Sequence, residues 1–409
     1  MVTTLGMARR LGVGAEASAE EQGVKEEGQH AQDEQDLDDD NHVFEEEFEG
    51  VDGAEEGGEE TVPAVMLSSP EGVCVGADGS IFVTDTVHCC VRKVSAGGRV
   101  TNVAGDGKRG QRDGKAEVAT YAGADKALAA QLSHPRGIAV DDAGNLFVCD
   151  SENHVVRGVS LEGRVSTLAG MMGKGGFKDG PALAGAAFRL PWACCRGLLD
   201  GGEALFVADA ANHCIRAVHT TASGALVKTI FGKAEVAGSG SCELNFPWSL
   251  AYHAGLLYVG DKYNQRVVVL SPEDAGGAVV VSDAWPWASR FAPRGMAATA
   301  DGLLMSNSFG ATIWVARMSE QHTPEHTPEP EKGGQEKGAA AKTGSTPFLL
   351  PPEKIAGNGL RSYRDGRAEL AEFLFPAGEH SCPAYVSICQ RRPSSCSLQV
   401  STVGDTSRH

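Results

Sequence analysis

Short apolar runs alternate with turn-forming residues in residues 133–170, SHPRGIAVDDAGNLFVCDSENHVVRGVSLEGRVSTLAG. Four runs have the length of strands, namely Gly137–Val140, Leu146–Cys149, Val155–Val159 and Val165–Leu168. The residues between them are rich in Asp, Asn, Gly and Ser, which tolerate the backbone angles of tight turns. The pattern predicts a four-stranded antiparallel meander, with the fourth run at its outer edge.

The second of these runs, Leu146–Cys149, is apolar at every position. Because successive side chains of a strand point to opposite faces, such a strand needs cover on both sides. A single sheet on one core would leave one face polar. The run therefore predicts sheets that are stacked face to face.

The meander repeats along the chain, and each copy opens at a proline. The prolines are spaced by 65, 56, 56 and 46 residues, at Pro70, Pro135, Pro191, Pro247 and Pro293. The second strands read IFVTD, LFVCD, LFVAD, LYVGD and LLMSN, and a sixth copy begins at FLFP, residues 373–376. Repeats of this period predict an all-β fold, a β-propeller of four-stranded antiparallel blades. We expect six blades, the last one degenerate.

Two copies, HPRGIAVDDAGNLFVCDSENHVVRGV and LFVADAANHCIRAV, resemble NHL repeats. The shared signature is an Asp followed by Asn-His and Arg, at Asp150, Asn153, His154 and Arg157 and at Asp209, Asn212, His213 and Arg216. Other copies keep part of it: Asp85 in the first, and Asp261 and Asn264 in the fourth, where Gln265 and Val268 replace His and Arg. The resemblance covers about residues 67–376 and implies a structural role for these positions.

Charge divides the chain into two parts. Residues 1–66 hold 20 of the 54 acidic and 3 of the 36 basic residues, so almost all of the net charge of −18 lies there. We expect 1–60 to be a disordered acidic arm and 61–409 to be the propeller. Within it, residues 319–346 have the composition of a disordered insertion in blade five, and 377–409 form the degenerate or atypical last blade.

The N-terminal sequence has no apolar stretch typical of a signal peptide, and no run of 18 apolar residues occurs. Most of the 11 cysteines lie in apolar strands, where Cys behaves as a small hydrophobic residue, and no CxxC occurs. We therefore expect a cytoplasmic monomer with no membrane span, no metal site and no cofactor.

Glycine-rich connections between copies, such as AGDGKRGQRDG and AGMMGKGGFKDG, superficially resemble phosphate loops. They lack the Lys-Ser/Thr pair and the following helix that a phosphate cradle needs. We expect the Asp of each DG pair, Asp113, Asp179 and Asp365, to bond the backbone of its own loop.

The residue after each proline opens an inner strand, and these residues are Glu71, Arg136, Trp192, Trp248 and Arg294. Arg and Trp often dominate binding energy, so Arg136, Trp192, Trp248 and Arg294 are the candidate binding residues. The alternative is that the Trp rings pack between blades and each Arg pairs with a carboxylate of a neighbouring blade. A single carboxylate among these openings makes a poor cation cage.

The sequence favours a non-catalytic propeller that serves as a protein–protein interaction platform. One alternative is a six-bladed hydrolase or lyase with a cation at the channel mouth, but no nucleophile motif such as GxSxG is present. Another is single-stranded RNA binding on a propeller rim, which the NHL resemblance implies. The nearly neutral repeat region speaks against nucleic acid, which requires clustered Lys and Arg.

Overall fold

The computed structural model describes residues 67–115 except 96, 130–221, 224–280, 291–317 except 309, 349–356, 384–389 and 397–402. The predicted disorder of 1–60 and of 319–346 lies outside these ranges, as does the C-terminal part of 377–409 beyond residue 402. No helix in the described ranges is long and apolar enough to cross a membrane.

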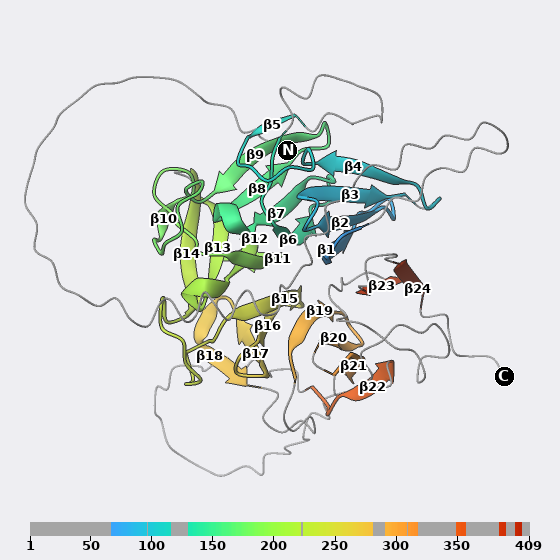
Figure 1. Cartoon of the computed structure of the whole chain (residues 1–409). Helices are drawn as coiled ribbons and strands as arrows, with labels where there is room; N and C mark the ends of the chain where they lie inside the picture. The colour runs from blue at the N-terminus through green and yellow to red at the C-terminus, as the bar shows by residue number, and fades with distance from the viewer. Residues whose placement is uncertain are drawn as a thin grey trace, which may run out of the picture. The chain divides into compact units, whose positions relative to one another are not determined.

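The described strands form five blades, each an antiparallel meander (Figure 1). Blade one is β1 (Pro70–Val75), β2 (Ile81–Asp85), β3 (Cys90–Val94) and β4 (Val100–Ala104); blade two is β6 (Pro135–Val140), β7 (Leu146–Asp150), β8 (Val155–Val159) and β9 (Arg164–Ala169); blade three is β11 (Pro191–Leu199), β12 (Gly202–Asp209), β13 (Cys214–Thr221) and β14 (Gly224–Gly232); blade four is β15 (Pro247–His253), β16 (Leu256–Asp261), β17 (Arg266–Ser271) and β18 (Asp274–Val280); blade five is β19 (Pro293–Ala298), β20 (Gly302–Asn307), β21 (Thr312–Arg317) and β22 (Glu353–Ala356). The inner strands β1, β6, β11, β15 and β19 lie side by side in this order. The predicted β-propeller of four-stranded antiparallel blades is confirmed.

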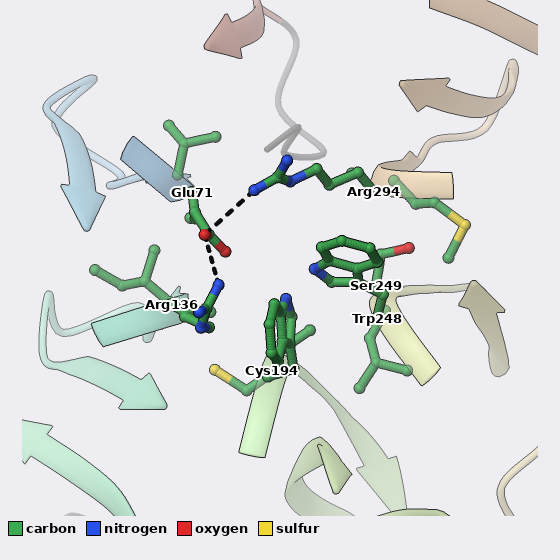
Figure 2. A pocket seen from close by; sticks show the side chains of 15 residues that line it. Glu71, Arg136, Cys194, Trp248, Ser249 and Arg294 are labelled. Carbon is green, nitrogen blue, oxygen red and sulfur yellow. Dashed lines mark hydrogen bonds and ion pairs between the residues drawn. The ribbon is translucent and has the colours of Figure 1, made fainter. Parts of the chain in front are cut away.

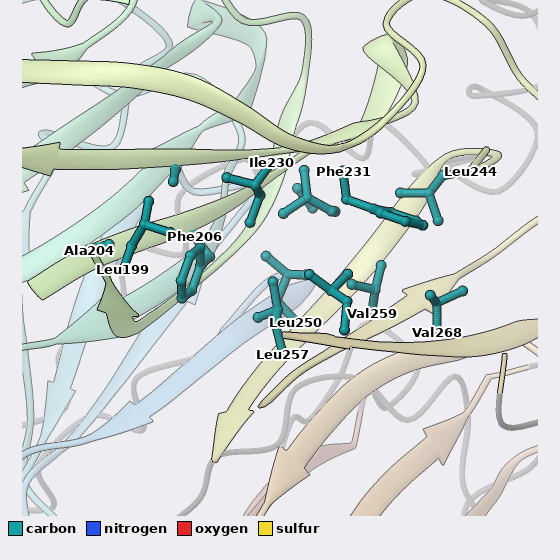
Figure 3. Close-up of a cluster of buried hydrophobic side chains, with 14 residues drawn as sticks. Leu199, Ala204, Phe206, Ile230, Phe231, Leu244, Leu250, Leu257, Val259 and Val268 are labelled. Atoms are coloured by element: carbon teal, nitrogen blue, oxygen red, sulfur yellow. The ribbon is translucent and has the colours of Figure 1, made fainter. Parts of the chain in front are cut away.

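The second strand of blade two shows why its sequence is apolar at every position. Leu146 and Val148 belong to a core with blade one, whereas Cys149 belongs to a core with blade three, against which Phe147 also packs. Both faces of β7 are therefore covered, as the run of four apolar residues predicted. The same arrangement recurs between blades three and four, where Phe206 packs with Leu250 and Leu257 (Figure 3).

The outer edge of two blades differs from the prediction. The strand β5 (Gly114–Lys115) pairs with β9, and β10 (Gly180–Pro181) pairs with β14, so the outer strands of blades two and three are not edges. Both short strands come from the connections that precede these blades. The DG connections at Gly114 and Gly180 thus each add a fifth strand to the next blade.

The fourth strand of blade five does not use the apolar residues 348–350, Phe-Leu-Leu. It is β22, which begins at Glu353. Pro351 and Pro352 lie between the two positions, and proline has no N–H to donate to a sheet. Leu349 is buried instead in the core between blades four and five.

The expected count of six blades is wrong, because the described strands form five. In the region of the sixth copy, the described residues form a two-stranded sheet of β23 (Ala384–Cys389) and β24 (Ser397–Thr402), with β23 beside β1. This region has two strand-length apolar runs and lacks the Asp and the DG turn of the other copies. Its sequence therefore lacks the signature residues that stabilise the other blades.

Candidate functional site

The residue that follows each opening proline lines one small pocket at an end of the central channel. These residues are Glu71, Arg136, Trp192, Trp248 and Arg294, so the structure brings all four predicted binding residues together. The cavity is about 60 Å³, room for a few atoms. Its position follows from the repeat, because equivalent positions of adjacent blades meet around the axis.

Two guanidinium groups share the carboxylate of Glu71. Arg136 Nη1 lies 2.5 Å from Glu71 Oε1, and Arg294 Nη2 lies 3.2 Å from the same oxygen (Figure 2). These contacts join blade one to blades two and five. Burial acts to raise the pKa of Glu71, but the two arginines outweigh burial and hold this pKa below its usual value.

The tryptophan rings lie between the cations. Trp192 and Trp248 meet edge to face with centroids 5.1 Å apart, and the Arg136 guanidinium lies 3.6 Å from the Trp192 centroid. The ammonium of Lys262 lies 3.5 Å from the Trp248 centroid and is also near Tyr263. We call Glu71, Arg136, Trp192, Trp248, Lys262 and Arg294 the mouth cluster.

Sequence reasoning did not select Lys262. Its signal is its place directly after Asp261, the signature Asp of blade four, because at this repeat position the other blades have Thr86, Ser151, Ala210 and Ser308. These four are small, so a buried lysine at this point of the repeat is out of pattern. Both tryptophans are largely buried, and Arg136 pairs with a carboxylate of another blade, which matches the packing alternative.

The repeat signature has a structural role in blade two. Asp150 accepts hydrogen bonds from the Ser133 amide (2.6 Å), from Asn153 (2.9 Å) and from Arg157 (2.7 Å). Arg157 also pairs with Asp113 at 2.6 Å. We expected Asp113 to bond the backbone of its own loop. This expectation is wrong, because the short contact of Asp113 is with Arg157 of the following blade.

Blade three repeats this arrangement. Asp209 binds Asn212 (2.9 Å) and Arg216 (2.7 Å), and Arg216 reaches Asp179 of the preceding connection at 2.6 Å. Burial raises the pKa of Asp209 to about 6, although Arg216 and Asn212 act to lower it. Asp365, the Asp of the third DG connection, lies outside the described residues.

The histidines of the signature link adjacent blades. His154 Nδ1 accepts a hydrogen bond from the Leu190 amide at 3.2 Å, and His213 Nδ1 accepts one from Phe246 at 3.1 Å. Both histidines have positive φ, 59° and 55°. They lie in two different blades, each bonded to the residue that precedes the next blade.

The divergent blades preserve the signature with other residues. In blade one, Asp85 binds His88 at 3.0 Å and Arg92 at 3.1 Å. In blade four, Asp261 binds Asn264 at 2.7 Å and Arg266 at 2.8 Å. Arg266 was missed because it lies five residues after the Asp instead of seven, at the start of β17.

Among the described residues, no group of three His, Cys, Asp or Glu is placed to hold a metal ion. At the mouth, Glu71 is already engaged by two arginines, and the other members are cationic or aromatic. The arrangement is suited to binding through charge and ring faces. It offers no second carboxylate for general acid–base chemistry among the residues that line the pocket.

The fold and the signature define a β-propeller of NHL-type repeats. The NHL repeat model matches residues 67–94 and 132–158. The chain is 28% identical over 190 residues to NHL repeat-containing protein 2 of Bos taurus, covering 45% of this chain and 25% of that protein. The chain therefore contains NHL repeats, and its described strands form a β-propeller.

A second relative is Protein SUPPRESSOR OF QUENCHING 1, chloroplastic, of Arabidopsis thaliana, 37% identical over 98 residues. The match covers 24% of this chain and 8% of that protein, so the chain spans a quarter or less of the length of either relative. A gluconolactonase structure from Xanthomonas campestris, XC5397, aligns with 82% of this chain and 86% of its own, at 12% identity and a TM-score of 0.49. This last likeness says nothing of activity.

Proposed function

We propose that this NHL-repeat propeller is a non-catalytic platform that binds a protein partner at the end of the channel that carries the mouth cluster. The observation that carries the proposal is the gathering of two arginines, a lysine and two tryptophans at one point of the ring. Arg and Trp are enriched among residues that dominate interface energies, and such residues are typically anchored in packed surroundings.

An exposed rim adjoins this buried cluster. Tyr263 is 40% exposed, and its ring lies 5.6 Å from that of Phe246, which in turn contacts Trp192 at 5.2 Å. Tyr is well suited to interfaces because one end of it is apolar and the other hydrogen-bonds. A partner that touches Tyr263 would thus contact the ring system of the mouth.

A photo-crosslinking amino acid in place of Tyr263 tests this proposal in the full chain. The matched control is the same substitution at Leu161, which is 68% exposed in the turn between β8 and β9. We expect protein adducts at position 263 that survive nuclease and exceed those at 161. Equal protein adducts at both positions would refute the platform, and adducts lost after nuclease would assign this end to RNA.

A further inference from the structure

The mouth cluster carries more positive than negative charge. Arg136 and Arg294 are cationic, whereas Glu71 is the one carboxylate among the described residues that line this pocket. All three are largely buried. Charges with little access to water interact strongly, so an excess of cations here favours an incoming anion.

The arginines also have unused hydrogen-bonding capacity. Nε of Arg136 and Nε of Arg294 are buried, and neither has a hydrogen-bond partner among the residues that the structure describes. The Arg136 side chain is only 9% exposed. Both guanidinium groups form their ion pairs with a single oxygen, Glu71 Oε1. Guanidinium forks bind carboxylates with two parallel hydrogen bonds, so these groups can serve a further oxygen acceptor.

At the opposite end of the channel, an arginine on β11, the strand that carries Trp192, has its charge balanced by carboxylates. Arg196 of β11 lies there and pairs with Asp142 at 2.9 Å and Glu203 at 3.0 Å. Its charge is matched by two exposed carboxylates. The excess of positive charge thus belongs to the mouth and not to the channel as a whole.

The size and shape of the charged area indicate the ligand. The cationic side chains gather around one cavity of about 60 Å³. They do not form an extended row of the kind that could follow a phosphate backbone. A carboxylate on a flexible side chain fits such a focus, and the surrounding rings can cover its methylene groups.

We propose that the mouth binds a carboxylate presented by an acidic segment of a protein partner, and that Glu71 competes with it for the same two guanidinium groups. This inference rests on the proposed function and specifies the chemistry of the partner. Glu71 is then a resident carboxylate that keeps the arginines oriented while the site is empty, and an incoming acidic side chain shares or takes over their donors.

The test uses the full chain and a fluorescein-labelled hexaglutamate peptide, with hexaglutamine as the neutral control. We expect Arg294→Gln to weaken hexaglutamate binding about tenfold or more, the loss typical of a charged hydrogen bond. Arg196→Gln removes the same charge from the other end of the channel, and we expect binding within about twofold of the wild type because that arginine is already neutralised.

The decisive variant is Glu71→Gln. If Glu71 competes with the ligand, this change strengthens hexaglutamate binding severalfold, whereas a purely structural carboxylate would leave binding unchanged or weaken it. Thermal unfolding monitors the fold of each variant. Should Arg294→Gln fail to fold, Arg294→Lys keeps the charge and loses the fork, and we expect it to bind more weakly than the wild type.

Three results would overturn the carboxylate site: equal binding of hexaglutamate and hexaglutamine, equal effects of the two arginine variants, or unchanged or weaker binding by Glu71→Gln. Labelled oligouridine that binds more tightly than hexaglutamate and loses affinity with Arg294→Gln would assign the mouth to RNA instead. The crosslink at position 263 separates the two proposals. If protein adducts persist there while hexaglutamate fails to bind, the platform stands and the carboxylate site does not.

Discussion

At the scale of single residues, the repeat signature is a buried Asp–Arg ion pair whose arginine also binds the preceding inter-blade connection. Arg157 and Arg216 each neutralise the Asp of their own blade and also pair with an Asp of the connection that precedes the blade. The pairs Asp150–Arg157 and Asp209–Arg216 are fully buried, and a buried charge that loses its partner is costly. In blades two and three, the signature therefore fixes the preceding connection against the blade.

Arg216→Met tests this role in blade three. Arg216 is fully buried and pairs with both Asp209 and Asp179, so its removal leaves a buried carboxylate without its cation. We expect a loss of about 3–5 kcal/mol in the free energy of unfolding, measured with urea. The matched change Arg164→Met, at an exposed position of β9, should cost less than about 0.5 kcal/mol. Similar losses in the two variants would contradict the role.

The raised pKa of Asp209 predicts a pH dependence. Burial raises its pKa to about 6 from 3.8, so the folded state binds a proton that the unfolded state releases between these values. The proton on Asp209 therefore adds to the free energy of unfolding in full below the pKa of this group in the unfolded chain, and the contribution is lost as the pH rises through about 6. Asp209→Asn removes the titration. The stability of the wild type relative to this variant should therefore fall by up to about 3 kcal/mol between pH 4 and pH 7. A difference that rises with pH would show the opposite shift.

At the scale of elements, inner strands of adjacent blades approach closely at glycines. A Cβ on Gly137 of β6 would lie 2.5 Å from Ala193 Cα and 2.8 Å from the Cys194 amide nitrogen of β11. These neighbours are backbone atoms, which cannot move without shifting a strand. Gly137 thus sets the spacing between blades two and three.

Gly137→Ala should destabilise the protein by about 1–3 kcal/mol, the usual cost of an overpacked contact. Gly158→Ala is the matched control in the same blade, because a Cβ there would have Ser166 Oγ at 3.9 Å as its nearest neighbour. Its effect should be neutral or slightly stabilising, since Ala loses less backbone freedom than Gly. Urea unfolding of the two variants measures the contrast, and equal midpoints would show that β6 can shift without cost.

Most elements could be predicted from the sequence because the second strand of each copy is apolar on both faces, which indicates that both faces are buried. LFVCD needs cover on both faces, and only stacked blades supply it. The short strands β5 and β10 could not be predicted, since two residues such as Gly114 and Lys115 show no periodicity. Arg266 was missed for another reason: its side chain reaches Asp261 from a different register position.

At the scale of the whole molecule, the sequence predicted which residues meet at the channel but not how they pair. Equivalent repeat positions must converge around an axis, so the five residues that follow the opening prolines could be named in advance, whereas Lys262 could not. That Glu71 contacts both Arg136 and Arg294 depends on how the first and fifth blades approach each other. The number of blades depends on the same closure, which no single repeat encodes.

Adjacent blades are joined by hydroxyl groups as well as by apolar cores. Thr86, Ser151 and Ser249 donate hydrogen bonds to the carbonyl oxygens of the next blades' opening prolines at 2.8, 2.6 and 2.7 Å. Between blades one and five, the described polar link is the Glu71–Arg294 pair. This pair therefore contributes to the coupling of the first blade to the fifth.

Glu71→Gln should uncouple blade one from the rest of the propeller. The change removes the ion pairs to blades two and five and leaves two buried guanidinium groups with a neutral acceptor.

The reactivity of buried cysteines measures this uncoupling. Cys74 and Cys90 report on blade one and Cys214 on blade three, because all three are buried free thiols. In the wild type, we expect them to react with a thiol reagent over the same range of urea, as in a cooperative unit. In Glu71→Gln, Cys74 and Cys90 should react at lower urea than Cys214, whereas Glu203→Gln, at an exposed pair within blade three, should keep the transitions together. Coincident transitions in Glu71→Gln would mean that the apolar cores alone couple the first blade to its neighbours.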